Sequence, residues 1–427
     1  MTSGASAGPP APTPGRVVAP VPAGGSVLCA MDSQRPTLLI TLTGRDRPGV
    51  TSRLFSVLAA HPLTVTDVEQ VVIWDRLVLG ALLSFDGPVD LTAAHRAVME
   101  IAADLGLEAE ITLGSGDGPG GARRQLHVTM LGSPLLPSAM AAIACRIAAG
   151  GANIDRIGRL AHYPVTCLEL DVSGADPQAL RAELSREAVR QQVDVAVQPG
   201  GLRRRAMRLI VMDVDSTLVQ GEVIELLAKR AGCAERVAEV TASAMRGELD
   251  FTSALRERVA LLEGLDASVF DEVRRELRLT PGARTLIRTL KRLGYRCGIV
   301  SGGFAQITDA LVERLGIDYS AANTLEIAGG KLTGRLAGPI IDRPGKARVL
   351  AQFARRAGVP LSQTVAVGDG ANDLDMITAA GLGVAFNAKP VVRDAADTTV
   401  NVPYLDAILY LLGISRDEVE AADAEDA

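Results

Sequence analysis

The chain has 427 residues, of which 48% are hydrophobic and 22% charged. This is a globular composition, and the length predicts two to four domains. No uncharged apolar run reaches the roughly 18 residues that a membrane span needs, so we expect no membrane partner. The net charge of −6 and the scattered arginines argue against nucleic acid. A small molecule is the expected partner.

The five cysteines lie far apart, without the paired spacing of a metal site, and no signal peptide opens the chain. We therefore expect a reduced, cytoplasmic protein. Cys29 and Arg35 have the Cys-x5-Arg spacing of a phosphate-binding loop, but they follow Pro/Gly/Ala-rich residues instead of a buried strand, and we interpret the spacing as chance. Residues 1–34 are predicted to be a disordered tail, in which Met31 is a second candidate start.

Residues 35–116 are predicted to form one small α+β domain. The hydrophobic pattern indicates, in order, strand 37–43, helix 48–61, strands 65–74 and 77–86, helix 91–106 and strand 107–113. The same order returns over residues 123–201, with Gly132 in the place of Gly44 and an offset of roughly 88 residues. Two ferredoxin-like units are therefore predicted.

The segment GRDRPGVTSRLFSVLA (44–59) closely resembles the first strand-to-helix turn of an ACT domain, a module that binds amino acids at subunit or repeat interfaces. Backbone N–H groups at such a helix start can bind a carboxylate. From the loop alone, a simple helix start is the better interpretation. The resemblance and the repeat imply instead an amino-acid effector, first of all L-serine, at Gly44, Asp46, Pro48 and Gly49. The second repeat reads GSPLLPS (132–138), which leaves its ligand binding open.

From 205 to 415 strands and helices alternate, as in a doubly wound parallel sheet. Strands are predicted at 207–212, 295–300, 364–369 and 382–386. Roughly 65 mostly helical residues separate the first two strands, which predicts a helical cap at about 220–285. A hairpin around Gly329 and Gly330 is expected near the cap, and the acidic residues 416–427 are expected to be a solvated tail. The predicted fold class is thus α/β, preceded by two ferredoxin-like α+β domains.

Polar residues follow these predicted strands. The carboxyl ends of parallel strands meet at one edge of the sheet, and ligands bind at that edge. Asp213 and Asp215 are two residues apart, and side chains at this spacing along a strand are expected to face the same side. Aspartates also end strands as turn formers, but other strand ends and a helix start contribute further groups: Ser301, Gly302, Lys346, Asp369, Asn372 and Asp373. Carboxylates suit a divalent cation, while hydroxyl, N–H and ammonium groups suit phosphoryl oxygens.

This combination resembles the haloacid dehalogenase superfamily of phosphatases over residues 207–413. The resemblance implies that Asp213 attacks phosphorus to form an aspartyl-phosphate, while Asp215 protonates the leaving oxygen and then activates water. Asp215 then needs a raised pKa, which we expect from neighbouring anions and partial burial. Mg²⁺ is implied at Asp213, Asp369 and the backbone carbonyl of Asp215, with Asp373 in support. The implied phosphoryl and substrate contacts are Ser301, Gly302, Lys346 and Asn372.

The histidines offer an independent test of this chemistry. All four precede residue 163, which excludes a histidine-based mechanism in the catalytic half. Ser216 and Thr217 are other hydroxyl nucleophiles to consider, but no histidine is present there to activate them. The nucleophile is therefore expected to be a carboxylate.

The cap narrows the resemblance to phosphoserine phosphatases, on the segments DVDSTLVQGEVIELLA and MRGELDFTSALRERVALLEG. By this resemblance Glu222 pairs with the substrate ammonium, Arg258 with its carboxylate, and Phe251 closes over the site. Without it, Arg258 is an ordinary solvated residue of an amphipathic helix. The predicted reaction is hydrolysis of O-phospho-L-serine to L-serine and phosphate, the last step of serine biosynthesis, by a homodimer or larger homo-oligomer.

Three alternatives stay open from the sequence. A phosphatase of another phosphoamino acid or of a phosphoprotein would keep the same catalytic residues. A phosphomutase also uses paired aspartates, but it gives no reason for Glu222 and Arg258. A non-enzymatic amino-acid sensor would keep the ACT pair on an inactive phosphatase fold, although all the catalytic carboxylates are present.

Overall fold

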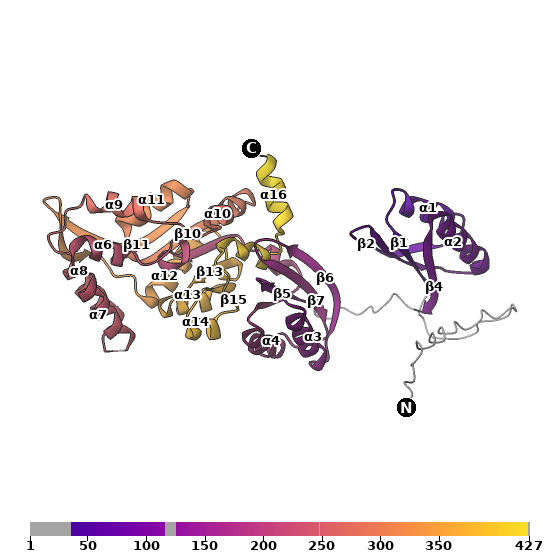
Figure 1. Cartoon of the computed structure of the whole chain (residues 1–427), viewed down its shortest axis with the longest axis horizontal. Coiled ribbons are helices and arrows are strands. Elements are labelled where there is room, and N and C mark those ends of the chain that lie inside the picture. Colours follow the sequence, from indigo (N-terminus) through magenta and orange to yellow (C-terminus); the bar gives the residue numbers. More distant parts are fainter. Residues whose placement is uncertain (1–35, 116–124, 247, 426–427) are drawn as a thin grey trace, which may run out of the picture. The chain divides into compact units, whose positions relative to one another are not determined.

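The computed structural model describes residues 36–115, 125–246 and 248–425 (Figure 1). They belong to two compact units, one ending at residue 122 and the other beginning at residue 123. The predicted tail, Met31 and the Cys29 to Arg35 spacing lie outside the described residues. Within the described ranges, no helix combines the length and apolarity that crossing a membrane requires.

The first unit holds one antiparallel sheet in the order β2-β3-β1-β4, covered by two helices. Its core joins alternate residues of the strands, such as Ile40 and Leu79, to Leu54 and Val98 of the helices. This is the predicted βαββαβ order. The elements are β1 (Pro36–Arg45), α1 (Val50–Leu58), β2 (Thr64–Ile73), β3 (Arg76–Ser84), α2 (Leu91–Leu105) and β4 (Leu107–Ser115).

The second unit begins with the repeat of this fold, a sheet in the equivalent order β6-β7-β5-β8. Its elements confirm the second predicted βαββαβ series. They are β5 (Gln125–Gly132), α3 (Pro137–Ala149), β6 (Asn153–Ala161), β7 (Thr166–Ser173), α4 (Pro177–Gln191) and β8 (Asp194–Pro199). A short helix, α5 (Leu202–Arg205), leads to the large sheet of this unit.

A seven-stranded sheet in the order β12-β11-β10-β9-β13-β14-β15 forms the rest of the second unit. All neighbouring strands are parallel except β11 and β12, which form the predicted hairpin. The strands are β9 (Leu209–Asp213), β10 (Arg296–Phe304), β11 (Tyr319–Ala328), β12 (Lys331–Ala337), β13 (Thr364–Gly368), β14 (Leu382–Phe386) and β15 (Thr398–Val400). The sheet is thus larger than the four strands predicted for it.

Both faces of this sheet are covered, as a doubly wound fold requires. In β9, Leu209 and Val211 pack with Phe353 on one face, while Ile210 and Met212 pack into the core cluster on the other. The core helices are α10 (Ala283–Arg292), α11 (Ala305–Leu315), α12 (Arg343–Ala357), α13 (Leu374–Ala379), α14 (Pro390–Ala395) and α15 (Ile408–Leu411).

The predicted cap is present between β9 and β10. Its helices are α6 (Val223–Ala231), α7 (Ala234–Met245), α8 (Phe251–Ala260) and α9 (Val269–Glu276). The hairpin joins it through backbone hydrogen bonds, since Gly264 N donates to Leu332 O (2.8 Å) and Ala267 N donates to Gly330 O (2.9 Å). The expected position of the hairpin beside the cap is therefore confirmed.

The prediction of a solvated acidic tail is wrong. Residues Arg416–Glu425 form helix α16, drawn in yellow in Figure 1. Val419 is buried in the main core, and Asp423 accepts hydrogen bonds from Arg288 and Arg292 of α10. Arg416 at the start of the helix also donates to Asp406 (3.4 Å). A few anchoring side chains thus dock a helix whose acidic composition resembles that of a solvated tail.

Candidate active site

The two aspartates that follow the first strand of the large sheet stand at the base of a cavity. β9 ends at Asp213, and the turn after it keeps Asp215 extended while Ser216 takes a left-handed φ of 57°. Ser216 N donates to Gly221 O (3.0 Å), which closes this turn. Both carboxylates line the cavity. The expectation that Asp213 and Asp215 face the same side is confirmed. The strand ends at Asp213, however, so the turn after it, and not strand alternation, places Asp215.

The cavity has a volume of about 680 Å³ and lies between the strand ends and the cap. Most predicted site residues line it: Asp213, Asp215, Glu222, Phe251, Arg258, Gly302, Asp369 and Asn372. Three others, Ser301, Lys346 and Asp373, are buried behind its wall and contact the lining carboxylates or their neighbours. The structure thus brings together all the residues that the sequence predicts for this centre.

Lys346 joins two of the carboxylates beneath the cavity. It lies in the first turn of α12, where the Asp342 side chain accepts from Gly345 N. Its Nζ lies 2.7 Å from Asp213 Oδ1 and 2.7 Å from Asp373 Oδ1. Burial lowers the pKa of Lys346, but these two carboxylates outweigh burial and hold the pKa above its ordinary value. Lys346 is therefore a fixed cation at this centre.

Asp213 is held in a strongly desolvating environment. Burial, together with repulsion from Asp373, raises the pKa of Asp213 well above its ordinary value, and Lys346 opposes the rise. Additional positive charge at this position would favour the ionised carboxylate that a nucleophile needs.

Asp215 is positioned by hydrogen bonds from two elements. Its Oδ1 accepts from Val223 N at the start of α6 (2.8 Å), and its Oδ2 accepts from the Ser301 hydroxyl (3.1 Å). Burial raises the pKa of Asp215, and these hydrogen bonds oppose the rise. The expected direction is confirmed. The expected contribution of neighbouring anions is not among its main causes. The nearby charges that act on it most, those of Lys346 and Arg258, lower the pKa of Asp215.

The cap wall presents two acids, Glu222 and Glu225, and one base, Arg258. Glu222 is exposed to the cavity and accepts from the Ser216 hydroxyl (3.2 Å). Partial loss of water and repulsion from Asp215 and Asp369 raise the pKa of Glu222 to about 7. Arg258, on α8, is half-buried and donates from Nε to Ala254 O (3.3 Å) in its own helix. Burial lowers the pKa of Arg258, against the attraction of Glu222 and Asp215.

Two glycines allow Phe251 of the cap and the Asp215 carboxylate to approach β10. A Cβ on Gly302 would lie 3.1 Å from the Phe251 ring, and one on Gly303 would lie 2.8 Å from Asp215 Oδ2. A side chain at Gly303 would therefore displace the acid, and one at Gly302 would press against the cap phenylalanine. The glycines of this segment are expected to allow close approach of a phosphate. The structure shows that the Phe251 and Asp215 side chains also approach them.

Three carboxylates of this centre fit a divalent cation. Oxygen atoms of Asp213, Asp369 and Asp373 lie within 4.8 Å of one another. With all three ionised against one ammonium, two negative charges stay uncompensated, which is the charge a divalent ion neutralises. Both Asp373 oxygens are already engaged, by Lys346 and by Gly370 N, so Asp213 and Asp369 are the more available ligands.

Two basic residues of the cavity escaped the sequence reasoning. Arg343 and Lys389 both line it. Arg343 is paired with Asp375 (2.6 Å). Lys389 follows β14, the fourth of the predicted strands, so the rule that polar residues after parallel strands face the ligand could have identified it.

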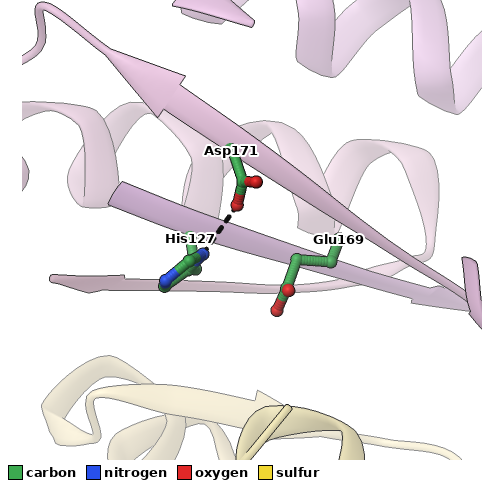
Figure 2. Close-up of side chains that lie close together, drawn as sticks. All are labelled: His127, Glu169 and Asp171. Carbon is green, nitrogen blue, oxygen red and sulfur yellow. Dashed lines mark hydrogen bonds and ion pairs between the residues drawn. The ribbon is translucent and has the colours of Figure 1, made fainter. Parts of the chain in front are cut away.

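A second cluster of titratable side chains lies on the sheet of the second repeat (Figure 2). His127 of β5 lies 2.8 Å from Asp171 of β7, and Glu169 projects from the same face of β7 as Asp171. Glu169 accepts from Arg204, whose guanidinium also donates to the backbone carbonyls of Tyr410 and Leu411. Glu169 thus belongs, through Arg204, to the contact between the repeat and helix α15, whereas His127 and Asp171 pair within the sheet of the repeat.

The predicted effector residues lie in the other unit, at the turn between β1 and α1. Gly49 precedes α1 with a left-handed φ of 94°, a conformation that favours glycine. A Cβ on Gly44 would lie 2.5 Å from the Leu107 side chain, so this position also needs glycine. Asp46 N donates to Asp75 O (2.6 Å), which ties the loop to the β2–β3 turn.

Comparison with known proteins defines the class first. Residues 210–378 match the haloacid dehalogenase-like hydrolase family, and residues 36–112 and 126–198 each match an ACT domain. The chain is therefore a haloacid dehalogenase-like hydrolase that carries two ACT domains.

Relatives then narrow the class. A phosphoserine phosphatase of Streptomyces coelicolor is 63% identical over 92% of this chain and 95% of its own length. One from Mycobacterium tuberculosis is 54% identical over 91% of this chain and 96% of its own length. A probable phosphoserine phosphatase of Vibrio cholerae, solved in unliganded form, is 34% identical with a TM-score of 0.55, over 69% of this chain and 88% of its own. The chain belongs to the phosphoserine phosphatase family.

Proposed function

We propose that this enzyme hydrolyses O-phospho-L-serine to L-serine and phosphate through an aspartyl-phosphate on Asp213, with Mg²⁺ as its cation. The observation that carries the proposal is the shared cavity. Asp213 and Asp215 at its base face Glu222 and Arg258 on its cap wall. Phosphoryl chemistry and recognition of an amino acid thus meet in one space.

Two protein carboxylates divide the covalent steps. An Asp213 oxygen attacks phosphorus, the bond from phosphorus to the serine oxygen breaks, and Asp215 gives its proton to that oxygen. Asp215 then takes a proton from water, whose oxygen attacks the phosphorus and releases phosphate from Asp213. Val223 N and Ser301 hold Asp215 in place for both transfers. Mg²⁺ at Asp213 and Asp369, with the Asp215 backbone carbonyl and Asp373 in support, would offset charge on the phosphoryl oxygens.

The cap wall selects the substrate in this proposal. An ionised Glu222 pairs with the substrate ammonium, and Arg258 pairs with its carboxylate, since only its Nε has a protein acceptor among the described contacts. Phe251 lies against Gly302 and limits the space beside the phosphate. Ser301, Gly302, Lys346 and Asn372 serve the phosphoryl end.

Phosphate release tests the catalytic proposal. We would supply L-phosphoserine, phosphothreonine and an aryl phosphate, each with Mg²⁺ or with EDTA. Strong, Mg²⁺-dependent preference for L-phosphoserine is the expected result. Equal rates with the aryl phosphate would contradict the proposed recognition of the substrate by Glu222 and Arg258. A preference for phosphothreonine would favour a phosphatase of another phosphoamino acid. No release from any substrate would favour the sensor alternative.

The ACT domains support a regulatory proposal. An amino acid, first of all L-serine, binds at the loop of Gly44, Asp46, Pro48 and Gly49 and changes phosphatase activity through the arrangement of subunits in a homodimer or larger homo-oligomer. The left-handed Gly49 at the start of α1 supports this position. Calorimetric titration of the intact enzyme with L-serine and other amino acids tests it. Absence of any binding heat and of any effect on turnover would contradict it.

A further inference from the structure

The second ACT domain is fastened to the last strand of the catalytic sheet by a buried carboxylate. Asp194, the first residue of β8, is 3% exposed. Its carboxylate accepts from Asn401 N (2.6 Å), from Asn401 Nδ2 (2.5 Å) and from the Thr399 hydroxyl (3.4 Å). A single ACT residue therefore fixes both the backbone and the side chains at the end of β15.

An ion pair holds the start of the same strand. Arg181 of α4 donates to Asp397 Oδ1 (2.8 Å), while Asp397 Oδ2 accepts from Gly383 N (2.9 Å). Asp397 directly precedes β15, and Gly383 lies in β14. The ACT domain thus holds β15 on both sides, and one of these contacts extends to β14.

From β15 the contacts continue to the cavity. Asn387 N donates to Val400 O (2.8 Å), and Asn387 adopts a left-handed φ of 45°. Two residues later, Lys389 N donates to Asp369 O (3.2 Å). The segment 387–389 is therefore held between β15 and Asp369, so β15 is one of the elements that position Lys389 in the cavity wall.

Lys389 is the available ammonium of this wall. It lines the cavity and is exposed, and no ion pair engages it within the ranges that the structure describes. Lys346 is buried between two carboxylates and Arg343 is paired with Asp375. The Lys389 charge is close enough to lower the pKa of Asp369, against the burial that raises it. A flexible ammonium in a cavity rich in carboxylates suits the capture of a phosphate dianion.

We propose that Lys389 guides the substrate phosphate into the cavity and that the second ACT domain positions Lys389 through Asp194 and β15. Lys389 is then a further substrate-binding residue, and Asp194 is a positioning residue for the same reaction. This inference rests on the proposed phosphatase function. It assigns the second ACT domain a role that needs no amino-acid ligand.

The first experiment removes the charge of Lys389. At low ionic strength, Lys389→Met should lower kcat/KM about tenfold with little change in kcat, and this loss should shrink as salt is added. Lys389→Arg should restore most of kcat/KM. Lys331→Met removes the same charge from the exposed start of β12, outside the cavity, and should leave kcat/KM unchanged. A loss confined to kcat, or an equal loss in Lys331→Met, would overturn the role of Lys389.

The second experiment asks whether Asp194 acts through Lys389. Asp194→Asn should lower kcat/KM about threefold in the wild-type background and cause no further loss in Lys389→Met, because residues of one network couple. The control is Gln198→Leu, since Gln198 lies on the same strand β8 but donates to Leu411 O. It should leave kcat/KM unchanged. Additive losses, or an equal loss in Gln198→Leu, would overturn the positioning role.

Two other causes of a negative result, a variant that does not fold and a wrong proposed function, can each be distinguished from a failure of this inference. If Asp194→Asn does not fold, Asn401→Ala takes its place in the same double-mutant cycle, because it removes one side-chain partner of Asp194 and leaves the carboxylate itself intact. If the wild-type enzyme prefers another phosphate ester to phosphoserine, the proposed substrate is wrong, but the same variants are then compared on that ester. Lys389 acts on the phosphate, so the expected losses are unchanged.

Discussion

The base of the cavity and its cap wall differ in how firmly their side chains are held. At the base, Lys346 and Asp373 are both 0% exposed, and the lysine binds two carboxylates at 2.7 Å. On the wall, Glu222 and Arg258 are accessible to solvent, and each has one hydrogen bond to a nearby residue. In the proposed mechanism, the groups that perform the chemistry are thus fixed by burial, whereas the groups proposed to select the substrate keep donors and acceptors free for it.

The largest expected effect comes from the base. Asp213→Asn should lower turnover of every phosphate ester by at least about 1,000-fold, because an amide is a poor nucleophile. Asp309→Asn, an exposed position on α11, is the matched control and should be fully active. Phosphate release from L-phosphoserine and an aryl phosphate measures both. Appreciable turnover in Asp213→Asn would mean that another group, such as Ser216 or Thr217, is the nucleophile.

Removing the buried cation should damage stability as well as rate. Lys346→Met leaves Asp213 and Asp373 buried without their shared partner, which should cost about 3–5 kcal/mol of unfolding free energy and most of kcat. Because the uncompensated charge grows, added Mg²⁺ should raise the Tm of this variant more than that of the wild type. Calorimetric melting with and without Mg²⁺ measures the difference. An unchanged Tm without metal would show that Lys346 contributes little to holding the carboxylates.

A wall residue should affect one substrate and spare another. Arg258→Ala should raise KM for L-phosphoserine about 10- to 100-fold, the range expected when a charged hydrogen-bond partner is lost. An aryl phosphate has no amino-acid carboxylate, so its KM should change little. Arg256→Ala, an exposed position on the same helix, is the control. Equal effects of Arg258→Ala on both substrates would show that Arg258 supports the cap and not the carboxylate.

The base was more predictable from sequence than its surroundings because its residues follow local rules. Buried apolar runs marked β9 and β14, and polar residues directly after strands identified Asp213, Ser301 and Asp369 as members of one centre. Asp215 needed no long-range information, since it lies two residues beyond Asp213.

Contacts between distant segments escaped the sequence. Asp194 and Asn401 are 207 residues apart, and a carboxylate at a strand start is usually read as a turn former. Helix α16 escaped for a related reason, because its docking depends on partners in α10 that no local pattern reveals. The contact of Phe251 with Gly302 likewise depends on the position of the cap over β10.

The smallest expected effect is a pH dependence of the preference for L-phosphoserine, caused by the titration of Glu222 on the cap wall. The pKa of Glu222 is raised to about 7, so its carboxylate is mostly neutral below that pH and loses its attraction for the substrate ammonium. The ratio of kcat/KM for L-phosphoserine to that for an aryl phosphate should therefore fall as pH decreases from 8 to 6. Titration of Asp215 affects both substrates and largely cancels in this ratio.

Glu222→Gln is the control for that pH dependence, because it keeps the shape of the side chain and removes its titration. The ratio should be low in this variant and flat across the same pH range. A wild-type ratio that does not change with pH would mean that Glu222 is not the partner of the ammonium. Of the two proposed selecting residues, Arg258 would then remain, and the contrast between wall and base would rest on that residue.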